Sequence, residues 1–269
     1  MAEIQKLIIA DAHAHIFPGK IAEKAVGAIG AFYSIPMQHP GSPEALLESG
    51  RAIGVRKYLV CSTATRPGQV VSINDFIRES CAVHPEFVGF GTLHPSFPDI
   101  PGEIRRIREM GLRGVKLHPD FQQFSIDDPA AFPIYEGCAE GGLPILFHTG
   151  DDRYDWSAPA RMAVVAKRYP ALICIAAHFG GYNHWQDVEL YRDLPNVFFD
   201  TSSTLFKLPQ ERALALIETM DPQRFFFGTD FPMWDHREEL ERFLALGLPA
   251  EARNAILYRN FQRVFEVAV

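Results

Sequence analysis

The chain has 269 residues, of which 47% are hydrophobic and 22% are charged, and its formal net charge is −7. This length and apolar content suit one large core, so we expect a single domain over residues 1–269. The negative charge, without a run of five like charges, argues against a nucleic-acid-binding or anionic-membrane-binding surface. A small molecule is the expected partner, and the sequence leaves homo-oligomerisation open.

Targeting signals are missing from the sequence. No apolar run approaches the ~18 to 20 residues needed to cross a membrane, and the N-terminus lacks the order of a signal peptide. The 4 cysteines show no C-x-x-C spacing, which favours reduced thiols. We therefore expect a cytoplasmic protein.

Short apolar runs alternate with amphipathic segments along the chain. The segments Pro101–Met110 and Gln210–Met220 have the apolar spacing of helices. Near-continuous apolar runs are typical of parallel strands covered by helices, and the alternation predicts an α/β fold, namely a (β/α)8 TIM barrel. The predicted strands are Leu7–Ala10, Lys57–Cys61, Phe87–Thr92, Gly114–Leu117, Leu143–Phe147, Leu172–Ala176, Asn196–Phe199 and Phe225–Gly228.

Several segments exceed this strand-and-helix repeat. Phe17–Pro43, rich in Gly and Pro, is too long for an ordinary connection and predicts a long lid loop after the first strand. Asp151–Pro159 is a second long loop, which could offer Arg153 to a ligand or be surface decoration. Glu238–Leu246 and Glu251–Val267 predict extra C-terminal helices.

The first predicted strand leads into the motif Asp11-Ala12-His13-Ala14-His15. Residues two apart on a strand share a face, so His13 and His15 can bind one ion together. Neutral imidazole is a preferred ligand of zinc and similar divalent metals. The motif therefore predicts part of a metal site, whose other ligands must come from elsewhere in the chain.

Polar residues recur where the other predicted strands end. From His94 onward they follow one another at steps of 22 to 30 residues, close to the ~31 expected per unit of an eight-unit barrel. The C-terminal rim of such a barrel is where sites are built, so the set predicts a metal constellation. For His94 and His118, each followed by Pro, a structural role is equally consistent. The set is His13/His15, Cys61-Ser62-Thr63, His94, Lys116/His118, His148, His178, Asp200-Thr201-Ser202 and Asp230.

Five blocks together resemble the amidohydrolase superfamily, specifically its amidohydrolase-2 branch. The resemblance runs over nearly the whole chain, to Asn260-Phe261, and implies a metal-dependent barrel enzyme without specifying a substrate. The blocks are D-A-H-A-H at 11–15, G-V-K-L-H-P at 114–119, F-H-T-G at 147–150, A-H-F-G-G at 177–181 and F-G-T-D-F-P at 227–232.

The resemblance implies a role for each motif residue. Its metal ligands would be His13, His15, His148 and Asp230, and Asp230 would also exchange protons with metal-bound water. His178 would polarise the substrate or shuttle a proton if one metal is bound, and would hold the second metal if two are bound. We expect one divalent ion, zinc in the first place, with manganese, iron and cobalt as alternatives. Three imidazoles and one carboxylate leave a coordination position open for water.

Three polar residues are expected to contact the substrate. Lys116 and His118 are two apart in the fourth predicted strand and so point to one face, while Arg153 could bind an acidic group. Arg66 is a weaker candidate for that role, and a solvated surface position is the more common outcome for either arginine. A bridging residue on the fourth strand, often a carboxylated lysine, marks many binuclear members of the superfamily, and Lys116 stands nearby in this sequence. We expect Lys116 to be unmodified and not to bridge two metals.

The sequence alone favours a hydrolase that cleaves a C–O or C–N bond of a small molecule such as a lactone or amide. The alternative is non-oxidative decarboxylation of a small unsaturated or aromatic carboxylic acid, which needs the same ligands. A catalytically silent binding protein on the same barrel is a third reading. The complete ligand set argues against it.

Overall fold

The computed structural model describes residues 7–269. The chain divides into two compact units, and each is treated by itself. The terminal unit consists of the described residues up to Val60, the short segment His84–Phe87 and Thr201–Val269, and the central unit consists of Cys61–Val83 and Val88–Asp200.

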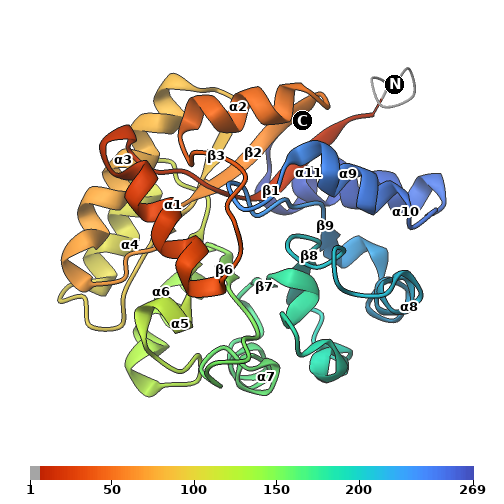
Figure 1. Cartoon of the computed structure of the whole chain (residues 1–269). Coiled ribbons are helices and arrows are strands. Elements are labelled where there is room, and N and C mark those ends of the chain that lie inside the picture. Colours follow the sequence, from red (N-terminus) through yellow and green to blue (C-terminus); the bar gives the residue numbers. More distant parts are fainter. Residues whose placement is uncertain (1–6) are drawn as a thin grey trace. The chain divides into compact units, whose positions relative to one another are not determined.

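The terminal unit combines the two ends of the sequence. It contains β1 (Ile9–His15), α1 (Gly19–Tyr33), α2 (Pro43–Arg51), β2 (Val55–Cys61, whose last residue opens the central unit), α8 (Gln210–Met220), the 3-10 helix η6 (Pro222–Arg224), β9 (Phe225–Phe226), α9 (His236–Leu244), α10 (Ala250–Asn254), the π-helix η7 (Ala255–Arg259) and α11 (Asn260–Phe265). In Figure 1 the red strand β1 lies beside the blue C-terminal helices, in agreement with the contact between β1 and η7.

The central unit holds the middle of the sequence. Its strands are β3 (Phe87–Gly89, which begins in the terminal unit), β4 (Gly91–Thr92), β5 (Val115–Leu117), β6 (Ile145–Phe147), β7 (Cys174–Ala176) and β8 (Val197–Asp200). Before β3 lie η2 (Pro67–Gln69) and α3 (Val70–Val83). Between the later strands lie α4 (Ile100–Glu109), α5 (Pro119–Gln122), η3 (Pro129–Ala131), α6 (Phe132–Gly141), α7 (Pro159–Arg168), η4 (His178–Gly180) and η5 (Trp185–Tyr191). Helices α4 and α6 pack together, as do α7 and η5.

The strands β4 to β8 pair in sequence order, and every pair is parallel. The register aligns Val115 with Ile145 and Ile145 with Cys174, so buried apolar residues line up across the sheet. Because parallel strands bring their carboxyl ends to one edge, the polar residues that follow β5, β6 and β7 come to that edge together.

Backbone hydrogen bonds in the terminal unit tie β1 to the segment after β9. Ala12 N donates to Phe227 O over 2.8 Å, and Asp230 N donates to His13 O over 2.8 Å. His15 N donates to Phe231 O over 2.6 Å. The segment that carries Asp230 is therefore held along the strand that carries the two histidines.

The eight predicted strands are all present, with adjusted ends. The first extends from Ile9 to His15, so the histidine motif lies within the strand rather than after it. The predicted strand Phe87–Thr92 is divided into β3 and β4. The predicted helix Gln210–Met220 is confirmed, and Pro101–Met110 is observed as α4, one residue earlier at each end.

The long lid loop predicted over Phe17–Pro43 is wrong as a loop, because most of it is the helix α1. Gly27 and Gly30 lower its intrinsic helix propensity, but Ala22 and Val26 lie one turn apart and are both buried. Tertiary packing of this face outweighs the glycines, and the prolines lie outside the helix. A lid function for the segment stays a prediction.

The predicted C-terminal helix Glu251–Val267 is interrupted by η7 and ends earlier, at Phe265. The wider π turn leaves the Ile256 carbonyl free to accept a 2.9 Å hydrogen bond from Phe227 N. In the part of the chain from residue 7 onward, none of the helices is long and apolar enough to cross a membrane.

Candidate functional site

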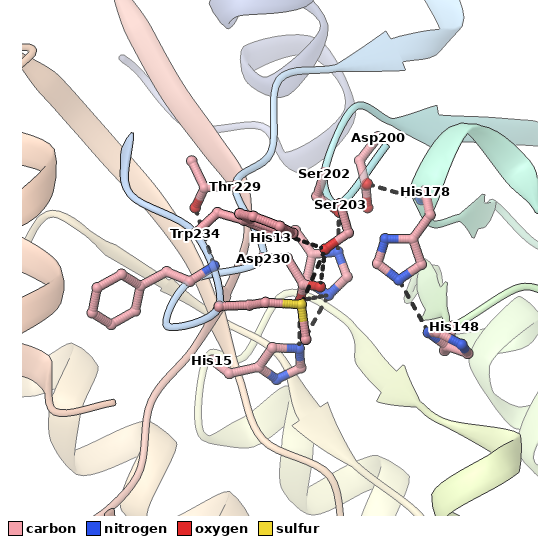
Figure 2. A network of polar contacts seen from close by, with 12 residues as sticks. His13, His15, His148, His178, Asp200, Ser202, Ser203, Thr229, Asp230 and Trp234 are labelled. Carbon is pink, nitrogen blue, oxygen red and sulfur yellow. Dashed lines mark hydrogen bonds and ion pairs between the residues drawn. The ribbon is translucent and has the colours of Figure 1, made fainter. Parts of the chain in front are cut away.

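In the terminal unit the side chains of His13, His15 and Asp230 face one another (Figure 2). The two Nε2 atoms are 3.2 Å apart, and Asp230 Oδ1 lies 3.6 Å from His13 Nε2 and 3.3 Å from His15 Nε2. Two ligand atoms on one tetrahedral zinc ion lie about 3.3 Å apart when each bond is about 2.0 to 2.1 Å long. The three donor atoms are therefore spaced as ligands of a single divalent ion.

This group is placed by backbone geometry. His13 and His15 alternate with buried alanines along β1, which turns both imidazoles to one face. Asp230 has a φ of 59°, in the left-handed region that is costly for a residue with a side chain. A strained conformation held by the backbone bond to His13 is typical of functional positions.

Serine hydroxyl groups contact His13 Nδ1 and Asp230 Oδ2, the atoms on the far side of these two side chains from the three-residue group. Ser202 Oγ lies 3.1 Å from His13 Nδ1, so this nitrogen can carry the ring proton toward the serine while Nε2 faces His15 and Asp230. Ser203 Oγ donates to Asp230 Oδ2 over 2.6 Å, which leaves Oδ1 to face the histidines. Trp234 Nε1 in turn donates to Ser203 Oγ over 2.9 Å.

Asp11 is a fully buried carboxylate that joins the two segments of the group. Its Oδ1 accepts hydrogen bonds from His13 N over 2.9 Å and Thr229 N over 3.1 Å, and its Oδ2 accepts from Thr229 Oγ1 over 2.6 Å. His236 Nε2 lies 3.0 Å from Oδ2. Asp11 thus holds His13 and also Thr229, the residue before Asp230.

In the central unit, His148 and His178 follow neighbouring strands and their side chains meet. His148 Nδ1 lies 3.0 Å from His178 Nε2, and His178 N donates to Asp200 Oδ1 over 3.1 Å (Figure 2). Trp185 Nε1 donates to the His178 carbonyl over 3.0 Å. His178 has a φ of 60°, so it too is held in the left-handed region by its surroundings.

His118 and Asp120 extend the central group. The His118 ring stacks on the His148 ring, with centroids 4.0 Å apart and planes inclined by 5°, and on Phe121 at 3.8 Å. Asp120 Oδ2 lies 3.9 Å from His148 Nε2. Burial raises the pKa of Asp120 to about 6, partly opposed by the Ser157 hydroxyl. Sequence reasoning missed Asp120, which follows His118 by two residues.

Three predicted substrate contacts, Lys116, His118 and Arg153, occupy different surroundings. Lys116 is buried in β5, while His118 lies just beyond the strand and caps α5. Arg153 forms an ion pair with Asp151, with Nη1 at 2.9 Å from Oδ2. Arg66, the weaker candidate, is exposed before η2. The substrate roles of all four stay predictions.

The ligand set predicted from sequence is therefore split between the units. The terminal unit brings together His13, His15 and Asp230, and the central unit brings together His148 and His178. Sequence reasoning missed the supporting residues Ser203 and Trp234. It named Ser202 only as a member of the set of polar strand ends and gave Asp11 no role, although Asp11 stands in the histidine motif itself. For Ser203 the usable signal was its place directly after Ser202.

A family model described as amidohydrolase matches residues 10–267, which spans both units. The chain belongs to the amidohydrolase-2 family. The resemblance drawn from the five sequence blocks is thereby confirmed.

The fold of this amidohydrolase is also shared with solved structures. An uncharacterised TIM-barrel protein from Bordetella bronchiseptica matches with a TM-score of 0.78 at 18% identity, over 97% of this chain and 99% of that chain. 5-Carboxyvanillate decarboxylase from Novosphingobium aromaticivorans, complexed with manganese and 4-hydroxy-3-methoxy-5-nitrobenzoic acid, matches with a TM-score of 0.75 at 16% identity, over 98% and 97%. The predicted (β/α)8 barrel is confirmed.

A curated relative matches part of the amidohydrolase chain. It is the 2-amino-3-carboxymuconate-6-semialdehyde decarboxylase of Dictyostelium discoideum, 33% identical over 88 residues, which is 30% of this chain. The aligned stretch spans 24% of that relative's length. The relative and the manganese-containing neighbour are both named as decarboxylases.

Proposed function

We propose that this amidohydrolase is a divalent-metal-dependent enzyme that removes carbon dioxide from a small aromatic or unsaturated carboxylic acid. The observation that carries the metal part is the spacing of His13 Nε2, His15 Nε2 and Asp230 Oδ1, which suits one ion. The choice of decarboxylation is supported by the activities named for the relative and the structural neighbour.

The proposed ligands are His13, His15, His148 and Asp230. The family match supports this ligand set. Zinc stays a prediction, and the manganese bound by the neighbour makes manganese the first alternative. A divalent ion held there would bind substrate oxygens and stabilise the negative charge that develops as carbon dioxide leaves.

The surroundings of Asp230 support decarboxylation over hydrolysis. A hydrolase of this type needs the carboxylate to take a proton from the attacking water. Here Oδ2 accepts the short hydrogen bond from Ser203, and Oδ1 faces both histidines. Both oxygens therefore already have partners, so Asp230 is better suited to metal binding than to general-base catalysis.

His178 is the proposed proton carrier. In decarboxylation the bond between the carboxyl carbon and the rest of the substrate breaks, carbon dioxide leaves, and the remaining carbon takes one proton. An imidazole can deliver this proton near neutral pH. The Asp200 and Trp185 hydrogen bonds fix the His178 backbone, so the ring is held in place for the transfer. Lys116, His118 and Arg153 are the proposed substrate contacts.

The test incubates metal-loaded protein with hydroxybenzoic acids, unsaturated acids, lactones and amides, while carbon dioxide release and ring or amide cleavage are both followed. In deuterated water, decarboxylation places one deuterium on the carbon that lost the carboxylate, which NMR detects. We expect His178→Asn to lose most turnover while keeping its metal. His84→Asn, which alters a histidine outside both groups, is the control. Lactone or amide cleavage without carbon dioxide release would refute the proposal.

A further inference from the structure

We propose that Asp120 is a positioning residue that accepts the Nε2 proton of His148 and so keeps His148 Nδ1 unprotonated, the state in which it can bind the metal. The inference rests on the proposed function, because it assumes that His148 is a metal ligand. It adds a carboxylate that lies outside the proposed ligand set.

The central observation is the Asp120 carboxylate. Its side chain is buried, and within residues 7–269 neither of its oxygens has a hydrogen-bond partner, although the Ser157 hydroxyl is near enough to lower the pKa of Asp120. A buried carboxylate without a well-formed hydrogen bond is costly, so such a group is retained where donors or a cation reach it. His148 Nε2 lies 3.9 Å from Asp120 Oδ2.

The protonation state of His148 follows from its proposed role. A neutral imidazole carries one proton, so a ring that binds a metal through Nδ1 must carry the proton on Nε2. His148 Nδ1 is the nitrogen that faces His178, and Nε2 is the nitrogen that faces Asp120. The 3.9 Å separation is about 1 Å longer than a direct hydrogen bond, so the proposal requires the carboxylate to move toward Nε2 by about that distance. Carboxylates that accept from a metal-binding histidine are a common way to fix its tautomer.

His118 also lies near this carboxylate. Its Nδ1 accepts a hydrogen bond from Phe121 N over 3.3 Å, so the neutral ring carries its proton on Nε2. One ring nitrogen of His118, one of His148 and one oxygen of Asp120 lie within 4.8 Å of one another. The stacked rings of His118 and His148 therefore lie beside one buried acceptor.

A second metal ion held by His118, Asp120 and His148 is the competing assignment. His118 would have to bind it through Nε2, because Nδ1 is occupied by the Phe121 N–H. That binding needs an Nε2 without a proton, which leaves the ring with no proton at all and makes it an imidazolate. The Phe121 hydrogen bond therefore favours the positioning role over the second ion.

The experiment measures manganese and cobalt affinity by chelator competition in Asp120→Asn, Asp120→Ala and the wild type. We expect metal affinity to fall 10- to 100-fold in Asp120→Ala, the range found when such supporting carboxylates are removed. The metal affinity of Asp120→Asn should fall less, because this side chain keeps one acceptor oxygen. The visible absorption spectrum of the bound cobalt should shift in both variants, because the ligand field of His148 changes. If Asp120→Ala does not fold, Asp120→Asn carries the test.

Glu103→Gln is the matched control, since Glu103 is also a buried carboxylate of the central unit but pairs with Arg106 and Asn74. It should lower the stability and leave the cobalt spectrum unchanged. The inference would be overturned if Asp120→Asn kept the wild-type metal affinity and cobalt spectrum. It would also be overturned if the wild type bound two ions per chain and Asp120→Asn bound one. If His148→Ala itself keeps wild-type metal content, the proposed ligand set fails instead, so the two failures are distinguishable.

Discussion

Ser203 Oγ donates a 2.6 Å hydrogen bond to Oδ2 of Asp230 while accepting one from Trp234 Nε1 at 2.9 Å. The serine therefore selects which carboxylate oxygen is directed at His13 and His15. Ser203 has a φ of 47°, so its place beside Asp230 is set by the backbone and not by a flexible rotamer alone.

We expect Ser203→Ala to weaken metal binding about 10-fold, because Asp230 loses the hydrogen bond that orients it. Chelator competition on the purified variant measures the change. Ser80→Ala, which removes a buried hydroxyl bonded to the Phe76 carbonyl, is the control and should leave the affinity unchanged. An unchanged affinity in Ser203→Ala would show that Asp230 needs no such support.

The metal content of the protein should be about one divalent ion per chain, because four ligands and one open position fit one site. Elemental analysis of protein purified without chelator measures it. We expect His13→Ala, His148→Ala and Asp230→Ala each to lose most of the metal while staying folded. Wild-type metal content in all three variants would show that the ligands are misassigned.

Lys116 should carry no carbamate. It is buried in β5, and a carboxylated lysine there would be expected only with a second ion beside it. Intact-mass measurement under native conditions, with added bicarbonate, checks the modification. A mass increase that corresponds to one carbamate, absent in Lys116→Arg and accompanied by two ions per chain, would contradict the single-metal assignment.

Glu239 should make the metal-free protein less stable as the pH rises. Burial raises the pKa of Glu239 from its ordinary value of 4.5 to about 8, although Arg242 opposes the shift. The folded state therefore holds this proton more tightly than the unfolded state, so the contribution is fully present below about pH 4.5 and is lost as the pH rises through 8.

Urea denaturation between pH 5 and pH 9 tests the direction of this pH dependence of stability. In Glu239→Gln the stability should depend less on pH, because the titrating group is gone. Glu238→Gln, which alters the more exposed partner of Arg242, should keep the wild-type dependence. A pH profile of Glu239→Gln equal to that of the wild type would mean that Glu239 stays ionised in the folded protein.

Much of the fold could be predicted from the sequence because apolar runs of four to eight residues are a local signal. The strands β5 and β6 lie inside their predicted ranges for this reason. Helix α1 could not be predicted, because its glycines favour a loop and only the burial of Ala22 and Val26 in the folded protein favours a helix. The π turn η7 also depends on a distant partner, the N–H of Phe227.

The candidate site, too, could be predicted only in part from the sequence. His13 and His15 share a face because of strand alternation alone, which the sequence shows. The contact of Asp230 with them depends on backbone pairing between residues more than 200 positions apart, and only the family resemblance suggested it. Asp120 was missed because an Asp after a His-Pro pair at a helix start is usually a cap, and only its burial without partners marks it.

The two units also differ in when they can form during synthesis. The central unit lies almost wholly within residues 61–200, so His118, Asp120, His148 and His178 can come together before the last part of the chain is made. The terminal unit must wait, because His13 and His15 belong to it from the start but Asp230 follows much later. At the ~5 to 20 residues per second of translation, the paired histidines stay without their carboxylate for at least 10 seconds or so. A nascent chain released before residue 230 would therefore lack the carboxylate that lies beside His13 and His15.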